Sequence, residues 1–195
     1  MNTPSNPHFG LAPSPWIAHF ASLVPAGARV LDLACGYGRH ALLFAARGAT
    51  VVAVDRDAAA LATLAQAPGI KTCLADLEAE AWPFGDERFD AIVVSHYLHR
   101  PLLSKLRSAL AADGALLYET FALGNEAYGR PASPAFLLRP GELLELAVAP
   151  PQPLTVVAFE QGLVDLSGRP AVMQRLAAVG AARAWPPPLG MTRIG

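Results

Sequence analysis

Residues 30–40, Val-Leu-Asp-Leu-Ala-Cys-Gly-Tyr-Gly-Arg-His, decide the fold that we expect for this chain. The apolar residues predict a buried strand, the glycines predict a turn, and a helix is expected from Arg39 on. Asp32 lies inside the apolar run, where an unpaired charge is costly. A cationic ligand or the amides of a helix terminus would compensate that carboxylate, and Gly36 and Gly38 would let a ligand approach the backbone.

Two cofactors fit this turn. The run Gly36-x-Gly38-x-x-Ala41 matches the dinucleotide pattern, in which a helix N-terminus holds a pyrophosphate. A carboxylate just ahead of the turn would repel phosphates, so Asp32 argues against a dinucleotide. S-adenosylmethionine (SAM) carries an ammonium and a sulfonium and no phosphate. The electrostatics therefore favour SAM and leave an NAD(P)-dependent oxidoreductase as the alternative.

This motif resembles that of the class I SAM-dependent methyltransferases. Their first motif is an acidic residue followed by small residues at alternate positions, which here are Asp32, Ala34, Gly36 and Gly38. Ala34 stands where glycine is usual. The resemblance extends over residues 14–180, and the runs at 97–103 and 118–121 are similar to small bacterial methyltransferases of the tellurite-resistance type. It implies that a methyl group passes from SAM to a small-molecule acceptor.

Short Val- and Leu-rich runs alternate with helical patterns along the rest of the chain. We expect strands at residues 29–34, 50–54, 71–75, 91–95, 115–120, 154–160 and 172–179. We expect helices at residues 39–47, 58–66, 101–111 and 140–148, and another that begins at Ser14-Pro15. This order predicts an α/β, Rossmann-like doubly wound fold. Its seven-stranded sheet is mostly parallel with an antiparallel terminal strand, and helices cover both faces.

The length of 195 residues predicts one domain, residues 1–195. Residues 1–13 are expected to be a loose arm and residues 185–195 an irregular tail. Residues 122–139 interrupt the alternation with glycine and proline. They follow the strand at 115–120, at the sheet edge where open α/β sheets bind ligands. We therefore expect a substrate or lid loop there.

The composition limits the classes of partner. Hydrophobic residues make up 53% of the chain, and its 15 basic and 16 acidic residues nearly balance. This balance gives little support to nucleic-acid binding. The absence of Lys and Arg before Arg29 and of a long apolar run predicts a cytoplasmic protein without a membrane segment. Cys35 and Cys73 are expected to be buried reduced thiols, and the apolar content leaves a homodimer open.

Candidate cofactor residues follow the first three expected strands. Asp55 ends the second strand, where a carboxylate can accept hydrogen bonds from both ribose hydroxyls of SAM or NAD. Alternatively it caps the next helix, a position that Asp57 would fill as well. The resemblance implies that Asp76 and Leu77 hold the adenine. The full predicted set is Asp32, Ala34, Gly36, Gly38, Arg39, Asp55, Arg56, Asp76, Leu77 and Ser95.

Candidate catalytic residues follow the fourth and fifth strands. His96 is a possible general base because its pKa lies near neutrality, and Tyr97 and Glu119 are the other candidates. The predicted acceptor-binding residues are His99, Arg100, Asn125, Tyr128 and Arg130. His96-x-x-His99 lacks a carboxylate or cysteine partner at ligand spacing, so no metal is expected. A non-catalytic SAM-binding protein remains a further alternative.

Overall fold

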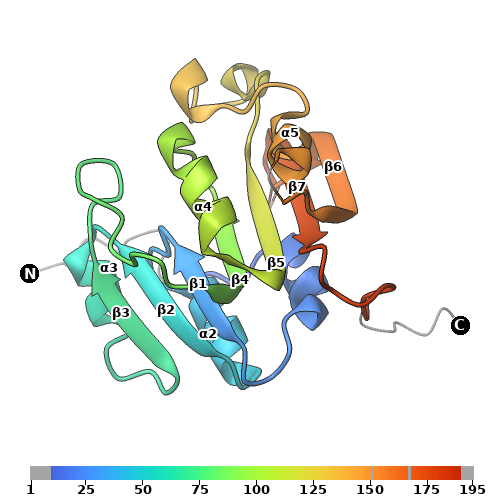
Figure 1. The fold of residues 1–195 in the computed structure, drawn as a ribbon. Helices are drawn as coiled ribbons and strands as arrows, with labels where there is room; N and C mark the ends of the chain where they lie inside the picture. The colour runs from blue at the N-terminus through green and yellow to red at the C-terminus, as the bar shows by residue number, and fades with distance from the viewer. Residues whose placement is uncertain (1–9, 151, 167, 190–195) are drawn as a thin grey trace, which may run out of the picture.

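The computed structural model describes residues 10–150, 152–166 and 168–189, and the strands within these ranges form one seven-stranded sheet (Figure 1). The strands are β1 Arg29–Leu33, β2 Thr50–Asp55, β3 Ile70–Leu74, β4 Phe89–Ser95, β5 Leu110–Phe121, β6 Thr155–Asp165 and β7 Pro170–Val179. Their order is β3-β2-β1-β4-β5-β7-β6. Only β7 runs antiparallel to its two neighbours, while the other pairs are parallel. The predicted sheet is therefore confirmed.

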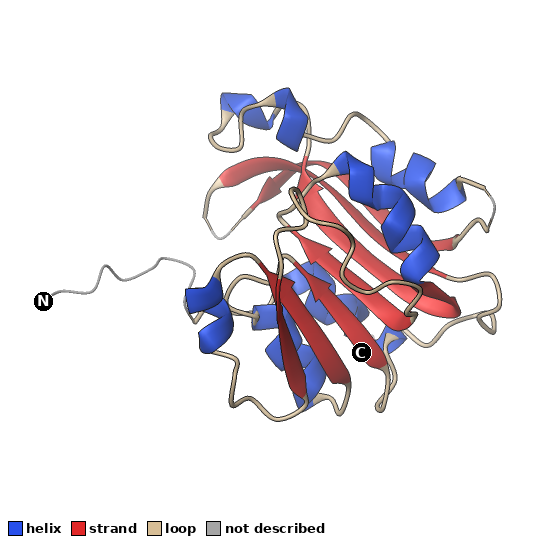
Figure 2. Ribbon diagram, turned by 60° about the vertical axis from the view of Figure 1, so that its left-hand side comes forward, coloured by secondary structure: helices blue, strands red, loops and turns tan. Residues whose placement is uncertain are grey.

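Helices cover both faces of the sheet, as predicted (Figure 2). One face packs against α1 Pro15–His19, the 3₁₀ helix η1 Phe20–Leu23, α2 Arg39–Ala46 and α3 Ala58–Ala62. The other packs against η2 Arg100–Leu102, α4 Leu103–Ala109 and α5 Glu142–Val148. Two short 3₁₀ helices, η3 Asn125–Ala127 and η4 Pro134–Phe136, lie in the segment that follows β5.

Side-chain alternation along the strands sorts the core into these two layers. In β1, Val30 packs with the α1 and α2 side, whereas Leu31 and Leu33 pack with the α4 and α5 side. Asp32 therefore faces the α1 and α2 layer. In β5 the same alternation separates Glu119 from Tyr118, which packs with the α4 and α5 side.

Some helices end earlier than their patterns predict. The helix expected at 58–66 ends at Ala62, because the next turn tightens into i to i−3 hydrogen bonds and the Thr63 hydroxyl donates to the Ala60 carbonyl. The helix expected at 101–111 is η2 followed by α4, and its end at Ala109 gives way to β5, which already pairs with β4 at Leu110. The expected arm is described only at residues 10–13, and the expected tail only at 185–189.

The connection directions reverse between β1 and β4, which are neighbours in the centre of the sheet. The crossover after β1 adds β2 and β3 on one side, and β5 follows β4 on the other. Ligands of open α/β sheets bind beyond the carboxyl ends of the strands at such a reversal. The residues that follow β1 and β4 are therefore the place to examine for a site.

Candidate active site

The loop between β1 and α2 needs three left-handed residues. Ala34, Gly36 and Gly38 have φ of +52°, +53° and +70°. A Cβ on Gly38 would overlap the Leu64 side chain, whose Cδ2 lies 2.7 Å from that position, whereas a Cβ on Gly36 would meet no atom within 4 Å. Gly38 thus lets the loop pack on the turn after α3, and Gly36 borders open space. Ala34 holds a conformation that costs a residue with a Cβ about 1–2 kcal/mol.

Asp32 stabilises the start of α2. Its side chain is 1% exposed, and Oδ2 accepts a hydrogen bond of 2.8 Å from the amide of Ala41. That amide belongs to the first turn of the helix, whose N–H groups lack partners within the helix. Burial raises the pKa of Asp32 to about 7, against the opposing effects of the Ala41 bond and of Arg39. Of the two compensations that the sequence suggests, the structure shows the amide of a helix terminus, and a ligand contact of Asp32 stays a prediction.

Asp55 ties the β1–α2 loop to the end of β2. Its Oδ2 accepts from the Gly36 amide at 2.7 Å, and its Oδ1 accepts from the Asp57 amide at 2.9 Å. A carboxylate has about four acceptor positions, so Asp55 keeps capacity for a ligand. Asp57 caps α3 through the amides of Ala59 and Ala60. Asp57 is therefore the residue that caps α3, which was the alternative role considered for Asp55.

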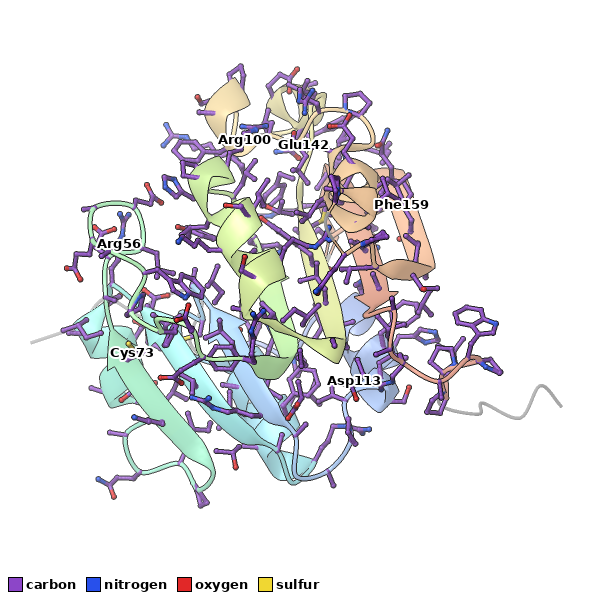
Figure 3. The ribbon with its side chains drawn as sticks, viewed as in Figure 1. Arg56, Cys73, Arg100, Asp113, Glu142 and Phe159 are labelled. Carbon is purple, nitrogen blue, oxygen red and sulfur yellow. The ribbon has the colours of Figure 1, made fainter. Side chains whose placement is uncertain are left out.

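A first cleft lies at the carboxyl ends of β1, β2 and β3 and has a volume of about 200 Å³. We call it the β2–β3 cleft. Its lining contains three carboxylates and one cation, Arg56, which Figure 3 labels beside the loop after β3. Five predicted cofactor residues line it, together with three that were not predicted to bind the cofactor. The full lining is Ala34, Asp55, Arg56, Ala75, Asp76, Leu77, Glu78 and Tyr97.

A second cleft of about 200 Å³ adjoins the first and shares Glu78 and Tyr97 with it. We call it the β4–β5 cleft, because most of its lining lies at the end of β5 or directly after β4. The segment 122–139 contributes Pro131 and Phe136, and its use as a substrate or lid loop stays a prediction. The full lining is Glu78, His96, Tyr97, Leu98, Thr120, Phe121, Pro131 and Phe136.

His96 and Tyr97 stand where the two clefts meet. His96 has φ of +55°, its amide donates to the Glu119 carbonyl, and its ring centroid lies 5.0 Å from that of Phe121. The Tyr97 hydroxyl is buried and has no hydrogen-bond partner among the described residues. Burial raises the pKa of Tyr97, so the hydroxyl keeps its proton and can donate to a ligand.

Glu119 and Ser95 belong to a polar chain on the face of the sheet that packs against α1 and α2. The Ser95 hydroxyl donates to Glu119 Oε1 at 2.9 Å and accepts from Arg39 Nη2 at 3.0 Å. Arg175 Nε lies 3.6 Å from Glu119 Oε2. Glu119 is 1% exposed and lines neither cleft. Its predicted acid or base function is not supported by this position, because alternation along β5 turns the side chain away from the site.

The predicted acceptor residues lie outside the described lining of both clefts. The guanidinium of Arg100 donates to both carboxylate oxygens of Glu142 and to two carbonyls of the segment 122–139; Figure 3 labels the two side chains next to each other. Asn125 is buried, donates to the Pro131 carbonyl and accepts from the Val172 amide. Both residues hold the segment 122–139 in place.

The other three predicted acceptor residues are His99, Tyr128 and Arg130. His99 is half-buried and precedes η2. Tyr128 and Arg130 are exposed. Each lies in a segment that contributes to the candidate site, but sequence position alone does not say which side chains turn inward.

Sequence reasoning missed Glu78 and the apolar wall of the β4–β5 cleft. Glu78 follows Asp76 in a turn where the Asp76 carboxylate accepts from the Glu78 amide, and this turn brings it between the clefts. The one sequence feature that could have pointed to Phe121 and Phe136 is their aromatic character in or beside a Gly- and Pro-rich segment. The aromatic residues Trp82 and Phe84 instead pack with the core, through a ring contact of Phe84 with Phe89.

The described residues contain neither a cluster of metal ligands nor a helix that could cross a membrane. Within residues 10–150, 152–166 and 168–189, no group of three or more His, Cys, Asp or Glu side chains is placed to hold a metal ion. No helix of these ranges has the length and apolar character needed to cross a bilayer. Cys35 and Cys73 are free thiols, the first buried and the second half-buried.

Comparison with known proteins gives a match to part of the chain. Residues 30–114 match the family model of a methyltransferase domain. An uncharacterized methyltransferase of Synechocystis sp. is 35% identical over 89 residues, which are 44% of this chain and 40% of that protein. The match thus spans less than half the length of the Synechocystis protein.

Solved structures share the fold at lower identity. TehB of Haemophilus influenzae superposes with a TM-score of 0.67 at 20% identity, covering 83% of this chain and 59% of that one. A Burkholderia thailandensis N1-methyltransferase superposes with a TM-score of 0.60 at 22% identity, covering 85% and 74%. That structure contains 1,6-didemethyltoxoflavin and S-adenosylhomocysteine. These likenesses confirm the Rossmann-like fold.

Proposed function

We propose that this chain, whose residues 30–114 match a methyltransferase domain, transfers a methyl group from SAM to a small-molecule acceptor. The observation that carries the proposal is the pair of clefts at the carboxyl edge of the sheet, which share Glu78 and Tyr97 as a common wall. A group-transfer enzyme needs its two ligands in contact. Two adjoining clefts satisfy that need, whereas a protein that only binds SAM needs one.

The charges of the β2–β3 cleft favour SAM over a dinucleotide. Its described lining holds the carboxylates of Asp55, Asp76 and Glu78 against the single cation Arg56. Such a lining attracts the positive ligand SAM and repels the pyrophosphate of NAD(P). This observation supports the methyltransferase over the oxidoreductase alternative.

The residues present fit SAM. Asp55 would accept from the ribose hydroxyls with the acceptor capacity that Gly36 and Asp57 leave. Asp76 and Leu77 would hold the adenine, and the open space at Gly36 would admit the methionine part. When bound, SAM supplies a methyl group on a sulfonium; the carbon–sulfur bond breaks as a lone pair of the acceptor forms the new bond.

The residues of the β4–β5 cleft would orient the acceptor and exclude water. Leu98, Phe121 and Phe136 offer apolar walls, and Tyr97 offers a buried donor. His96 lines the same cleft and would take a proton from an acceptor that loses one on methylation. The Burkholderia enzyme, whose structure holds a small heterocyclic molecule beside S-adenosylhomocysteine, supports an acceptor of this size.

Calorimetric titration with SAM, S-adenosylhomocysteine and NADH tests the proposal. We expect SAM and its product to bind and NADH to give no response. Asp55→Ala should weaken SAM binding by about tenfold or more, since it removes a charge-assisted hydrogen bond to the ribose. Asp57→Asn is the control, because it alters a neighbouring carboxylate that lines neither cleft. Binding of NADH without SAM would show that the chain is a nicotinamide-dependent protein instead.

A further inference from the structure

We propose that the acceptor of the β4–β5 cleft is a planar, uncharged or cationic molecule, and that the cleft rejects anions. This inference rests on the proposed function, because it assigns the second cleft to the methyl acceptor.

The walls of the cleft favour a flat molecule. Leu98, Phe121, Pro131 and Phe136 present apolar surface, and the rings of His96 and Phe121 lie 5.0 Å apart. Aromatic walls favour stacking with another planar group.

The charges in the cleft exclude an anionic acceptor. Glu78 is the one carboxylate in the described lining, which contains no Lys or Arg. His96 is the one group in this lining that can gain a positive charge. With His96 neutral the lining carries one negative charge, and with His96 protonated the two charges cancel. In neither state is the lining positive, so an anion gains no net attraction from it.

The arginines near the segment 122–139 do not alter this balance. The Arg100 guanidinium lies 2.7 Å from the Glu142 carboxylate and is held by backbone carbonyls. Arg130 is exposed, and neither arginine belongs to the lining. An oxyanion acceptor would therefore meet no arginine or lysine in the described lining.

Polar contacts in the cleft suit an uncharged acceptor. The buried Tyr97 hydroxyl has no hydrogen-bond partner among the described residues, and a buried donor without a partner is costly. A ring nitrogen or carbonyl of a ligand that reaches the wall shared by the two clefts would receive that hydrogen bond. Thr120 and His96 provide the other polar groups of the lining.

Calorimetry on the protein saturated with S-adenosylhomocysteine tests the inference with three probes. Benzimidazole is planar and uncharged near neutral pH, benzimidazole-5-carboxylate adds one negative charge to the same ring, and tellurite is an inorganic oxyanion. We expect benzimidazole to bind about tenfold or more tightly than its carboxylate, since one like charge at short range has that effect in a partly exposed site. Tellurite should give no response.

Matched variants connect the preference to the cleft. Glu78→Lys should remove or reverse the preference for benzimidazole over its carboxylate, whereas Glu80→Lys, an exposed position outside the lining, should leave it unchanged. Phe136→Ala should weaken the binding of benzimidazole about fivefold or more, because the contact with the phenylalanine ring is lost. Tyr128→Ala is its control, since Tyr128 is 48% exposed, much like Phe136 at 49%, and lines neither cleft.

Three outcomes would overturn the inference. They are equal or tighter binding of the carboxylate, binding of tellurite in competition with benzimidazole, and no binding of either ring probe. A failure of S-adenosylhomocysteine to bind contradicts the proposed function instead. In that case the same titrations on the unloaded protein still decide whether the β4–β5 cleft prefers uncharged rings.

Discussion

Asp32 and His40 are buried titratable residues with pKa values shifted in opposite directions. Burial raises the pKa of Asp32 to about 7, while the Ala41 amide and Arg39 oppose the shift and Asp55 adds to it. Burial lowers the pKa of His40 to about 3, and Arg39 and His96 add to the shift. His40 Nε2 accepts from the Ser14 amide at 3.1 Å, which requires the neutral ring. The two residues therefore affect stability against pH with opposite signs.

The signs follow from proton linkage. The folded state binds more protons at Asp32 than the unfolded state between about pH 4 and 7, so this residue lowers stability as pH rises there. The unfolded state binds more protons at His40 between about pH 3 and 6.5, so this residue lowers stability as pH falls there. In the shared window the two effects oppose each other.

We predict that Asp32→Asn and His40→Gln change the pH dependence of the free energy of unfolding in opposite directions. Relative to the unmodified protein, the free energy of unfolding of Asp32→Asn should rise with pH between about pH 4 and 7. That of His40→Gln should fall with pH between about pH 3 and 6.5, each by at most about 1.4 kcal/mol per pH unit. Urea unfolding across this range measures both. Parallel profiles for all three proteins would contradict the assignment.

At the scale of the element, the β1–α2 loop uses its two glycines for different purposes. Gly38→Ala places a Cβ against Leu64 in a left-handed backbone, and we predict a loss of about 3 kcal/mol from strain and overpacking together. Gly36→Ala meets open space and should cost only the strain of about 1 kcal/mol. Gly36→Ala should nevertheless weaken the binding of S-adenosylhomocysteine, because the methyl group of the alanine enters the space beside the β2–β3 cleft.

A double-mutant cycle with Leu64→Ala separates these two effects. Gly38→Ala should cost at least about 1 kcal/mol less when Leu64 is already truncated, because the overlap is gone. Gly36→Ala should have the same effect in both backgrounds. Additive energies for Gly38 and Leu64 would show that the overlap is not the source of the loss.

Arg100 joins η2 to the start of α5 through Glu142. We predict that Arg100→Met lowers stability by about 2–3 kcal/mol, because it leaves the nearly buried Glu142 carboxylate with only Arg139 as a cation. Arg139→Met is the matched control. The Arg139 side chain is 60% exposed, so its removal should cost under about 1 kcal/mol. Urea unfolding gives both values. Unchanged stability with weaker acceptor binding would instead restore the acceptor function that the sequence predicts for Arg100.

At the scale of the molecule, the sequence predicts the architecture and the cofactor edge more fully than the acceptor site. Strand periodicity, the Asp32 to Gly38 motif and the placement of Asp55 and Asp76 depend on local spacing, and the structure brings Asp55 and Asp76 into one cleft. The acceptor cleft depends on which side chains turn inward in the segment 122–139. Phe136 does so while Tyr128 does not, and no pattern in the sequence distinguishes them.

A polar chain runs across β4, β5, β7 and β6 and leads from α2 to the β6 edge of the sheet. It passes from Arg39 through Ser95 to Glu119, then to Arg175 on β7 and Glu160 on β6. Burial decreases from Glu119 toward that edge, since Glu119 is 1% exposed and Glu160 is 55% exposed. Because an ion pair is costly to break only where the remaining charge is buried, the two carboxylates should depend on Arg175 to different degrees.

We predict that Arg175→Met costs about 3 kcal/mol of stability, because the Glu119 carboxylate is left buried without the cation 3.6 Å away. Glu160→Gln removes the exposed partner of the same arginine and should cost under about 1 kcal/mol. In Arg175→Met, Glu119→Gln should recover part of the loss, since the uncharged amide no longer requires a cation. Urea unfolding of the three variants measures these differences. Equal costs for Arg175→Met and Glu160→Gln, or no recovery in the double variant, would show that Glu119 does not depend on this arginine.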